Sequence, residues 1–231
     1  MSERKKVVVT GASSGIGYAT AQRFAREGWD VCVTARRESI LRELVCTFPE
    51  GNHLVCPGDY SDPACADSIG KAIAANWQSL DALANVAGVY MAAKVVDSPL
   101  EEWRRPLDAM VNGAVYMTRM AVPWMTNGGR IIHCTSIHGD RAEVGSSAYA
   151  TAKAAINQYC RGLALELAEQ NILVNAVAPS ILDTPPNRAA MPKADHAAWP
   201  KVEEVAATIL FLASPDNGVT RGAIVPVYGK T

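Results

Sequence analysis

Short apolar runs alternate with longer amphipathic stretches along the whole chain. Most of the short runs are continuously apolar and do not alternate strictly with polar residues. This pattern favours strands of a parallel sheet that is covered on both faces. The expected strands are Val7–Val9, Asp30–Ala35, Leu54–Cys56, Leu80–Val86, Arg130–Cys134, Ile172–Ala178 and Ala223–Val227.

Several stretches between these runs carry apolar residues three and four positions apart, which is the spacing of one helix face. The regular alternation of strands and helices predicts an α/β fold. We expect one domain over residues 1–231, a doubly wound parallel sheet of about seven strands with helices on both faces. The expected helices are Tyr18–Glu27, Ser39–Thr47, Pro63–Trp77, Pro99–Met125, Tyr149–Gln170 and Val202–Ala213.

One irregular region, Asp183–Pro200, contains four prolines. It follows a strand end, and open α/β folds bind their ligands at that edge of the sheet. Two interpretations remain open, a substrate-covering loop and a plain surface connection.

The composition argues against several classes of protein. The 231 residues carry a net charge of -1, and only 19% of them are charged, so we expect no nucleic-acid partner. The apolar run after Lys6 is too short for a signal peptide or a membrane anchor, and no membrane association is expected. Six scattered cysteines without a C-x-x-C pair indicate buried thiols in a reducing cytosol, which predicts a cytoplasmic protein.

A glycine-rich loop, TGASSGIG, lies between the first expected strand and the first helix. Gly11 permits a sharp turn, Gly15 lets a ligand approach the backbone, and Gly17 brings helix and strand together. The free N–H groups of the helix start suit a diphosphate. The spacing is G-x-x-x-G-x-G, and in this context it predicts a dinucleotide site.

The residues after the second strand bear on the choice of cofactor. An acid at this point holds ribose hydroxyls, whereas an arginine accommodates a 2′-phosphate. The chain reads Ala35-Arg36-Arg37, with no carboxylate before Glu38. We therefore expect NADP(H) rather than NAD(H), the alternative being two solvated arginines.

Tyr149 and Lys153 lie four residues apart on an expected helix, and therefore on one face. A phenol has an ordinary pKa of about 10, and a neighbouring ammonium lowers it towards the range useful for acid–base catalysis. Ser136 ends the fifth strand run, and its hydroxyl can hold a substrate oxygen. The three side chains predict an acid–base site.

With these motifs in this order, the chain resembles the short-chain dehydrogenase/reductase family from about Val7 to Gly229. TGASSGIG is similar to the family's coenzyme loop, and Ser136, Tyr149 and Lys153 match its active-site trio. Further matches are Asp59, the segment Asn85-Val86-Ala87-Gly88, Asn112 and Pro179–Thr184. The departures from the family pattern are Val86, Ser180 and the pair Tyr228-Gly229.

The resemblance implies a Rossmann fold and a role for each matching residue. Tyr149 is expected to be the general acid or base, Ser136 to orient the carbonyl oxygen, and Lys153 to assist Tyr149 and bind the nicotinamide ribose. Asn112 is expected to hold a relay water through its helix backbone, and the chain to form a homo-oligomer (tetramer or dimer). The expected cofactor-binding residues are Gly11, Ser13, Ser14, Gly15, Ile16, Gly17, Arg36, Arg37, Asp59, Tyr60, Asn85, Ala87, Gly88, Tyr149, Lys153, Pro179, Leu182 and Thr184.

Substrate-binding residues are only faintly indicated. Tyr90, His138 and Arg141 follow strand ends, where they would meet a substrate, although Arg141 and His138 equally suit a solvated loop. The four histidines show no ligand spacing, so no metal is expected.

The predicted function is NADP(H)-dependent interconversion of a small or medium ketone or aldehyde and its alcohol. Two alternatives remain, a non-catalytic NADP-binding sensor or partner protein on the same fold, and an isomerase or dehydratase that reuses the site.

Overall fold

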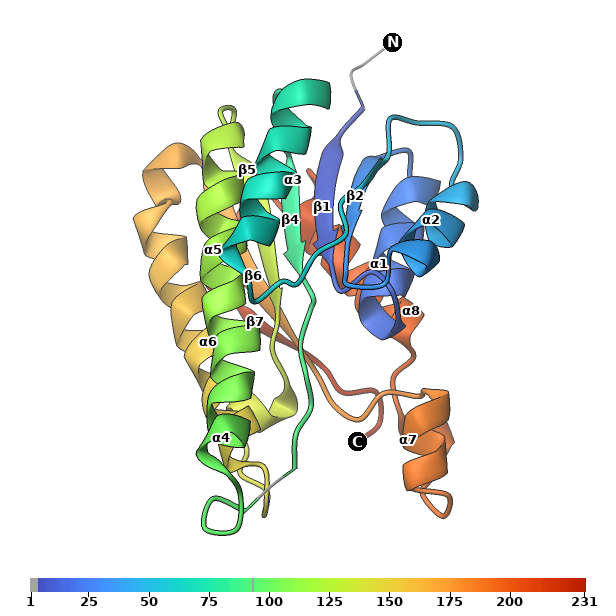
Figure 1. Ribbon diagram of the computed structural model, residues 1–231, viewed down its shortest axis with the longest axis vertical. Coiled ribbons are helices and arrows are strands. Elements are labelled where there is room, and N and C mark those ends of the chain that lie inside the picture. The colour runs from blue at the N-terminus through green and yellow to red at the C-terminus, as the bar shows by residue number, and fades with distance from the viewer. Residues whose placement is uncertain (1–3, 93) are drawn as a thin grey trace.

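A computed structural model describes residues 4–92 and 94–231. Seven strands form one sheet in the order β3-β2-β1-β4-β5-β6-β7, and every neighbouring pair is parallel. This confirms the predicted α/β class with a doubly wound parallel sheet (Figure 1). The strands are β1 Lys6–Thr10, β2 Asp30–Thr34, β3 Leu54–Val55, β4 Ala82–Asn85, β5 Gly129–Cys134, β6 Ile172–Pro179 and β7 Ile224–Val227.

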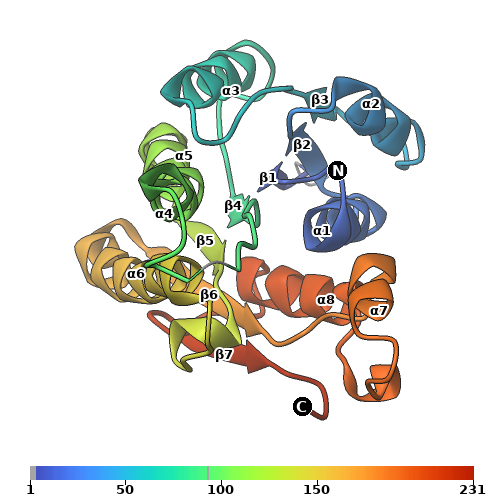
Figure 2. The ribbon, with the colours of Figure 1, turned by 60° about the horizontal axis from the view of Figure 1, so that its bottom comes forward.

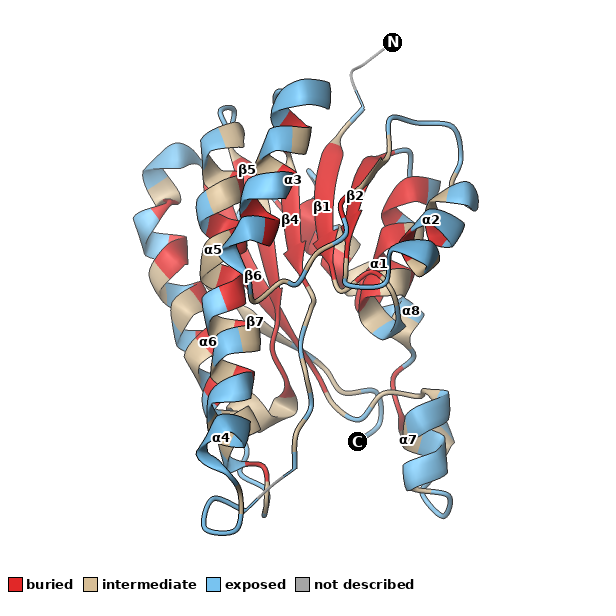
Figure 3. Ribbon diagram, viewed as in Figure 1, coloured by how far each residue is buried: buried red, intermediate tan, exposed pale blue. Residues whose placement is uncertain are grey.

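Helices cover both faces of the sheet (Figure 2). One apolar cluster joins the sheet to α3, α5 and α6, and a second joins the opposite face to α1, α2 and α8. Because both faces are covered, β1, β2 and β6 are buried at every position, as their continuous apolar runs predict (Figure 3). The helices are α1 Gly15–Arg26, α2 Glu38–Cys46, α3 Pro63–Asn76, α4 Leu100–Pro106, α5 Gly113–Ala121, α6 Ser147–Glu166, α7 Pro185–Ala190 and α8 Val202–Ala213.

The single helix expected over Pro99–Met125 is wrong in detail. The structure divides it into α4, a π-helical segment Leu107–Asn112, α5 and a short 3-10 turn. Pro106 ends α4 and has no N–H group to continue the regular hydrogen-bond ladder. The widened π turn follows directly, in agreement with the tendency of such turns to occur at functional sites.

The region Asp183–Pro200 is also more ordered than expected. It contains α7 and a 3-10 turn over His196–Ala198. The Thr184 side chain accepts a hydrogen bond from Asn187 N, and prolines occupy the first helical positions. Both features are typical helix-start signals.

The strand order reverses between β1 and β4, because the chain adds β2 and β3 on one side of β1 and all later strands on the other. Open α/β sheets bind ligands outside the carboxyl ends of the strands at such a point. The fold therefore predicts a ligand site at the loops after β1 and β4.

In the part of the chain that the structure describes, no helix is long and apolar enough to cross a bilayer.

Candidate active site

The loop between β1 and α1 requires glycine. Gly11 adopts a φ of +69°, and a Cβ atom there would come within 2.9 Å of Ala87 Cα. A Cβ atom on Gly17 would lie 2.3 Å from the Gly11 carbonyl oxygen. The N-cap residue Ser14 makes no side-chain hydrogen bond to the start of α1. The helix start therefore presents amides that its cap does not satisfy, and these fit a diphosphate.

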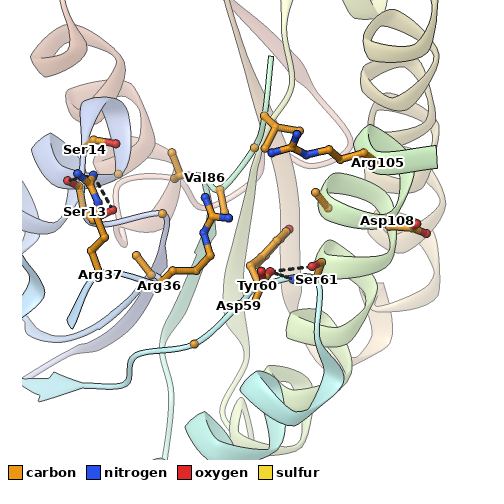
Figure 4. A pocket seen from close by; sticks show the side chains of 18 of the residues that line it. Ser13, Ser14, Arg36, Arg37, Asp59, Tyr60, Ser61, Val86, Arg105 and Asp108 are labelled. Atoms are coloured by element: carbon orange, nitrogen blue, oxygen red, sulfur yellow. Dashed lines mark hydrogen bonds between the residues drawn. The ribbon is translucent and has the colours of Figure 1, made fainter. Parts of the chain in front are cut away.

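A cleft of about 1000 Å³ lies over this loop, where the carboxyl ends of β1, β2 and β4 meet (Figure 4). Its walls come from segments far apart in the sequence, as expected for a site at a topological switch point. Many of the predicted cofactor residues line it, namely Gly11, Ser13, Ser14, Ile16, Gly17, Arg36, Arg37, Asp59, Tyr60, Ala87, Gly88 and Leu182.

Charged groups dominate one end of the cleft. The Arg37 guanidinium donates to Ser13 O at 3.0 Å and to Ser13 Oγ at 3.2 Å, which holds it beside the glycine loop. Asp59 accepts from Ser61 Oγ at 2.7 Å and from Ser61 N at 2.9 Å. These bonds lower the pKa of Asp59, and the charge of Arg36 lowers it further.

The opposite wall contains two residues that our reasoning from the sequence missed. Arg104 and Arg105 of α4 line the cleft, and Figure 4 shows Arg105 and Arg36 extending into it from opposite sides. The sequence signal was a second pair of adjacent arginines, of the same kind as Arg36-Arg37. The cleft is therefore lined by four arginines together with three carboxylate residues, and Arg104 lies 3.9 Å from one of these, Glu101.

A second hollow of about 180 Å³ adjoins the cleft. The two share Ile16, Val86, Gly88, Val89 and Leu182 in their linings. Besides the shared residues Ile16, Gly88 and Leu182, the sequence-predicted residues that line the second hollow are Tyr90, Ser136, Tyr149, Lys153 and Pro179. The predicted Ser–Tyr–Lys trio is therefore brought together beside the cleft.

The positions of the trio suit proton transfer. Lys153 Nζ lies 5.6 Å from the centroid of the Tyr149 ring and donates to Cys134 O at 2.7 Å. Lys153 is only 4% exposed, so its ammonium group is held beneath the phenol in a protected position. Ser136 Oγ accepts from His138 N at 3.2 Å, which leaves the hydroxyl hydrogen available to a substrate oxygen.

Six predicted residues lie outside the linings of both hollows. Gly15 forms the turn into α1, and Thr184 caps α7. Asn85 is buried in β4, with its Nδ2 atom 3.4 Å from His133 Nδ1 on the neighbouring strand. The Asn112 side chain donates to Asp108 Oδ1 at 2.9 Å. Arg141 and His138 are the remaining two, and they follow Ser136 in the loop before α6.

The two loop residues have partners of their own. The Arg141 guanidinium lies 5.4 Å from the centre of the Tyr228 ring. His138 Nε2 lies 3.2 Å from Glu143 Oε2, and the imidazole packs against the Tyr149 ring. His138 therefore supports the wall of the second hollow without lining it.

Among residues 4–92 and 94–231, no group of three His, Cys, Asp or Glu side chains is placed to hold a metal ion.

Comparison with known proteins identifies the family. A family model described as enoyl-(acyl carrier protein) reductase, one of the short-chain dehydrogenases/reductases, matches residues 11–229. The meso-2,3-butanediol dehydrogenase of Serratia marcescens is 30% identical over 98% of this chain and 94% of its own. The chain is a short-chain dehydrogenase/reductase. The motifs in the sequence and the similarity over the whole chain therefore indicate the same family.

Two solved structures are also similar to this chain. The acetoin dehydrogenase from Enterobacter cloacae is 32% identical, with a TM-score of 0.88 over 99% of this chain and 96% of that one. The L-sorbose reductase from Gluconobacter frateurii, solved with NADPH and L-sorbose, is 28% identical, with a TM-score of 0.90 over 98% of this chain and 96% of that one. The Rossmann fold and an oxidoreductase of the NAD(P)(H) class follow for this chain.

Proposed function

We propose that this short-chain dehydrogenase/reductase uses NADP(H) to interconvert a small ketone or aldehyde and the corresponding alcohol by hydride transfer. The observation that carries the proposal is the convergence of Ser136, Tyr149 and Lys153 on one hollow that adjoins the glycine-floored cleft. A phenol, a hydroxyl and an ammonium at the end of a dinucleotide-sized cleft suit carbonyl reduction.

The arginines support NADP(H) over NAD(H). The 2′-phosphate of NADP would bind among Ser13 Oγ, Arg36 and Arg37, since Arg37 already contacts Ser13 and no carboxylate occupies the position that would hold a ribose hydroxyl. The amides at the start of α1 would receive the diphosphate. Bound NADPH would supply the hydride for the carbonyl carbon.

Each member of the trio then has a distinct role. Ser136 donates a hydrogen bond to the substrate carbonyl oxygen and orients it. Tyr149 delivers the proton to that oxygen as the alcohol forms, and takes it back in the oxidative direction. Lys153, fixed by Cys134 O, places a positive charge beneath the Tyr149 ring and stabilises the negative charge that develops during transfer.

The hollow favours a small substrate. The hollow beside the trio has a volume of about 180 Å³, much less than that of the adjoining cleft. The relatives described above are named for butanediol, acetoin and sorbose, which are neutral compounds with oxygens on adjacent carbons. We propose a short hydroxy ketone of this kind, covered by the segment 183–200, whose neighbour Leu182 lines both hollows.

Replacing Tyr149 by phenylalanine tests the function. With acetoin and NADPH, we expect Tyr149→Phe to lower kcat by about a thousandfold, because the proton donor is lost. The dissociation constant of NADPH, measured by calorimetry, should change less than about threefold, since the arginines and the glycine loop are intact. The control Tyr116→Phe removes a phenol from α5 outside both hollows and should keep full activity.

Two outcomes would contradict the proposal. Undiminished turnover by Tyr149→Phe would exclude Tyr149 as the acid. Absence of carbonyl reduction by the unmodified protein, across a panel of small ketones and aldehydes with both nicotinamide cofactors, would favour a binding protein that senses NADP.

A further inference from the structure

The wall of the large cleft opposite the glycine loop carries an arginine with no partner in the described chain. Arg105 lies in the last turn of α4 and lines the cleft. It makes no hydrogen bond or ion pair with any described residue. Figure 4 shows its side chain extending from α4 into the cleft, towards the side that carries Val86. A guanidinium group in this position can donate several hydrogen bonds to an anionic ligand.

The three carboxylates of the cleft have other partners. The Glu101 carboxylate lies 3.9 Å from Arg104 Nη1. Asp59 and Asp108 accept hydrogen bonds from neighbouring side chains. In Figure 4 the Asp108 carboxylate points away from the side of α4 from which Arg105 enters the cleft. The charge of Arg105 is therefore not neutralised by the acidic residues around it.

The position of Arg105 along its helix does not account for this charge. A cation in the last turn interacts favourably with the free carbonyl groups at a helix end. However, α4 continues without a break into the π-helical segment Leu107–Asn112 and then into α5, so its last turn is not a free helix end. The next residue, Pro106, is buried and anchors the backbone, so the Arg105 side chain extends from a fixed base.

The order of the strands indicates which phosphate of a dinucleotide Arg105 would meet. β1 lies between β2 and β4 in the sheet. The glycine loop follows β1, Arg36 and Arg37 follow β2, and the segment that leads to α4 follows β4. Figure 2 shows α4 beside α5 and α6, across the sheet from α1 and α2. The diphosphate site proposed at the glycine loop therefore lies between the arginine pair and Arg105.

We propose that Arg105 is a further cofactor-binding residue, which binds the diphosphate of the nicotinamide cofactor from the wall opposite the glycine loop. This inference rests on the proposed function. The amides at the start of α1 bind one side of the diphosphate, and the Arg105 guanidinium donates to oxygens on the other side. Both NADPH and NADH carry the diphosphate, so Arg105 strengthens the binding of both, whereas Arg36 and Arg37 distinguish between them.

Binding of both cofactors, measured by calorimetry, tests the role of Arg105. Arg105→Gln removes the charge and keeps a polar side chain at an exposed position. We expect it to weaken NADPH and NADH by about tenfold each, with their ratio unchanged within about twofold. Arg105→Lys keeps the charge but loses the planar fork, and should weaken both by about threefold. The control Arg119→Gln makes the same change on the exposed surface of α5, outside both hollows, and should keep both dissociation constants.

Two nucleotide fragments separate the phosphates. ADP carries a diphosphate and no 2′-phosphate, whereas adenosine 2′-phosphate carries only the latter. Each is titrated as a competitor of NADPH. We expect Arg105→Gln to weaken ADP by about tenfold and adenosine 2′-phosphate by less than about twofold.

The outcomes distinguish the inference from the proposed function. A loss confined to NADPH and adenosine 2′-phosphate would assign Arg105 to the 2′-phosphate and overturn the inference. Unchanged dissociation constants for both dinucleotides in Arg105→Gln would overturn it as well, and either result leaves the proposed function standing. If the unmodified protein binds neither NADPH nor NADH, the proposed function itself is refuted, and the inference falls with it.

Discussion

Replacing His133 should change how the stability of the protein depends on pH. His133 lies in β5 and is 1% exposed, and its ring Nδ1 atom lies 3.4 Å from the Asn85 amide on β4. Its Nε2 atom has no hydrogen-bond partner among the described residues. Burial lowers the pKa of His133 from 6.5 to about 4, and the nearby charge of Lys153 contributes to the lowering.

The magnitude follows from the two pKa values. The folded state binds the proton only below about pH 4, whereas the unfolded chain binds it below 6.5. Acid therefore favours the unfolded chain, and the stability present above pH 6.5 is lost as the pH falls towards 4. The loss from this one group amounts to about 2 kcal/mol at pH 5 and about 3 kcal/mol at pH 4.

Urea unfolding between pH 4 and pH 8 measures this effect. His133→Asn keeps a polar group opposite Asn85 but cannot take up a proton, so its acid loss should be smaller than that of the unmodified protein by about 3 kcal/mol at pH 4. Any packing defect shifts the variant equally at every pH and cancels in the comparison. Equal acid dependence in His133→Asn and the unmodified protein would refute the reasoning.

Two further predictions concern the cofactor cleft. Changing both Arg36 and Arg37 to alanine should weaken NADPH binding by at least about thirtyfold and NADH binding by less than about threefold, because only NADPH carries the extra phosphate. Calorimetry with both cofactors, with the exposed Arg42→Ala as control, measures this, and equal weakening would exclude the assignment. Gly17→Ala should destabilise the fold by about 2 kcal/mol and weaken NADPH binding, because its Cβ atom would lie 2.3 Å from Gly11 O. Urea unfolding that leaves the midpoint unchanged would contradict this.

Local sequence patterns located most of the sheet. The buried run Ile172–Ala178 became β6, Ile172–Pro179, because hydrophobic continuity and β-branched residues report burial on both faces. The expected strand Leu80–Val86 was longer than β4, Ala82–Asn85. Strand ends depend on which neighbours supply hydrogen-bond partners, and this information is not local.

The segment Pro99–Met125 shows where a local pattern is insufficient. Its apolar spacing fits one continuous helix, whereas the structure contains a π turn after Pro106. The residue pattern does not distinguish backbone hydrogen bonds that span four residues, as in an α-helix, from bonds that span five, as in a π-helix. The choice depends on how the helix packs against the sheet and on the hydrogen bond that proline cannot make.

The candidate site likewise has features that local sequence patterns predict and features that depend on the packing of distant segments. The glycine loop, the Arg36-Arg37 pair and the Tyr149–Lys153 spacing were visible in the sequence because each works through neighbours within one loop or one helical turn. The approach of Arg105 to the cleft and the packing of the Tyr90 and His138 rings on Tyr149 were not, since each joins residues from different elements.

The sequence by itself therefore determined the alternation of strands and helices, the glycine turn after β1 and the spacing of Tyr149 and Lys153. These features rest on side-chain periodicity, backbone freedom at glycine and spacing along one helix. Only the tertiary structure decided which charges face each other across the cleft and which groups surround Tyr149. Such contacts join residues far apart in the chain, and their distances are set by the packing of helices on the sheet.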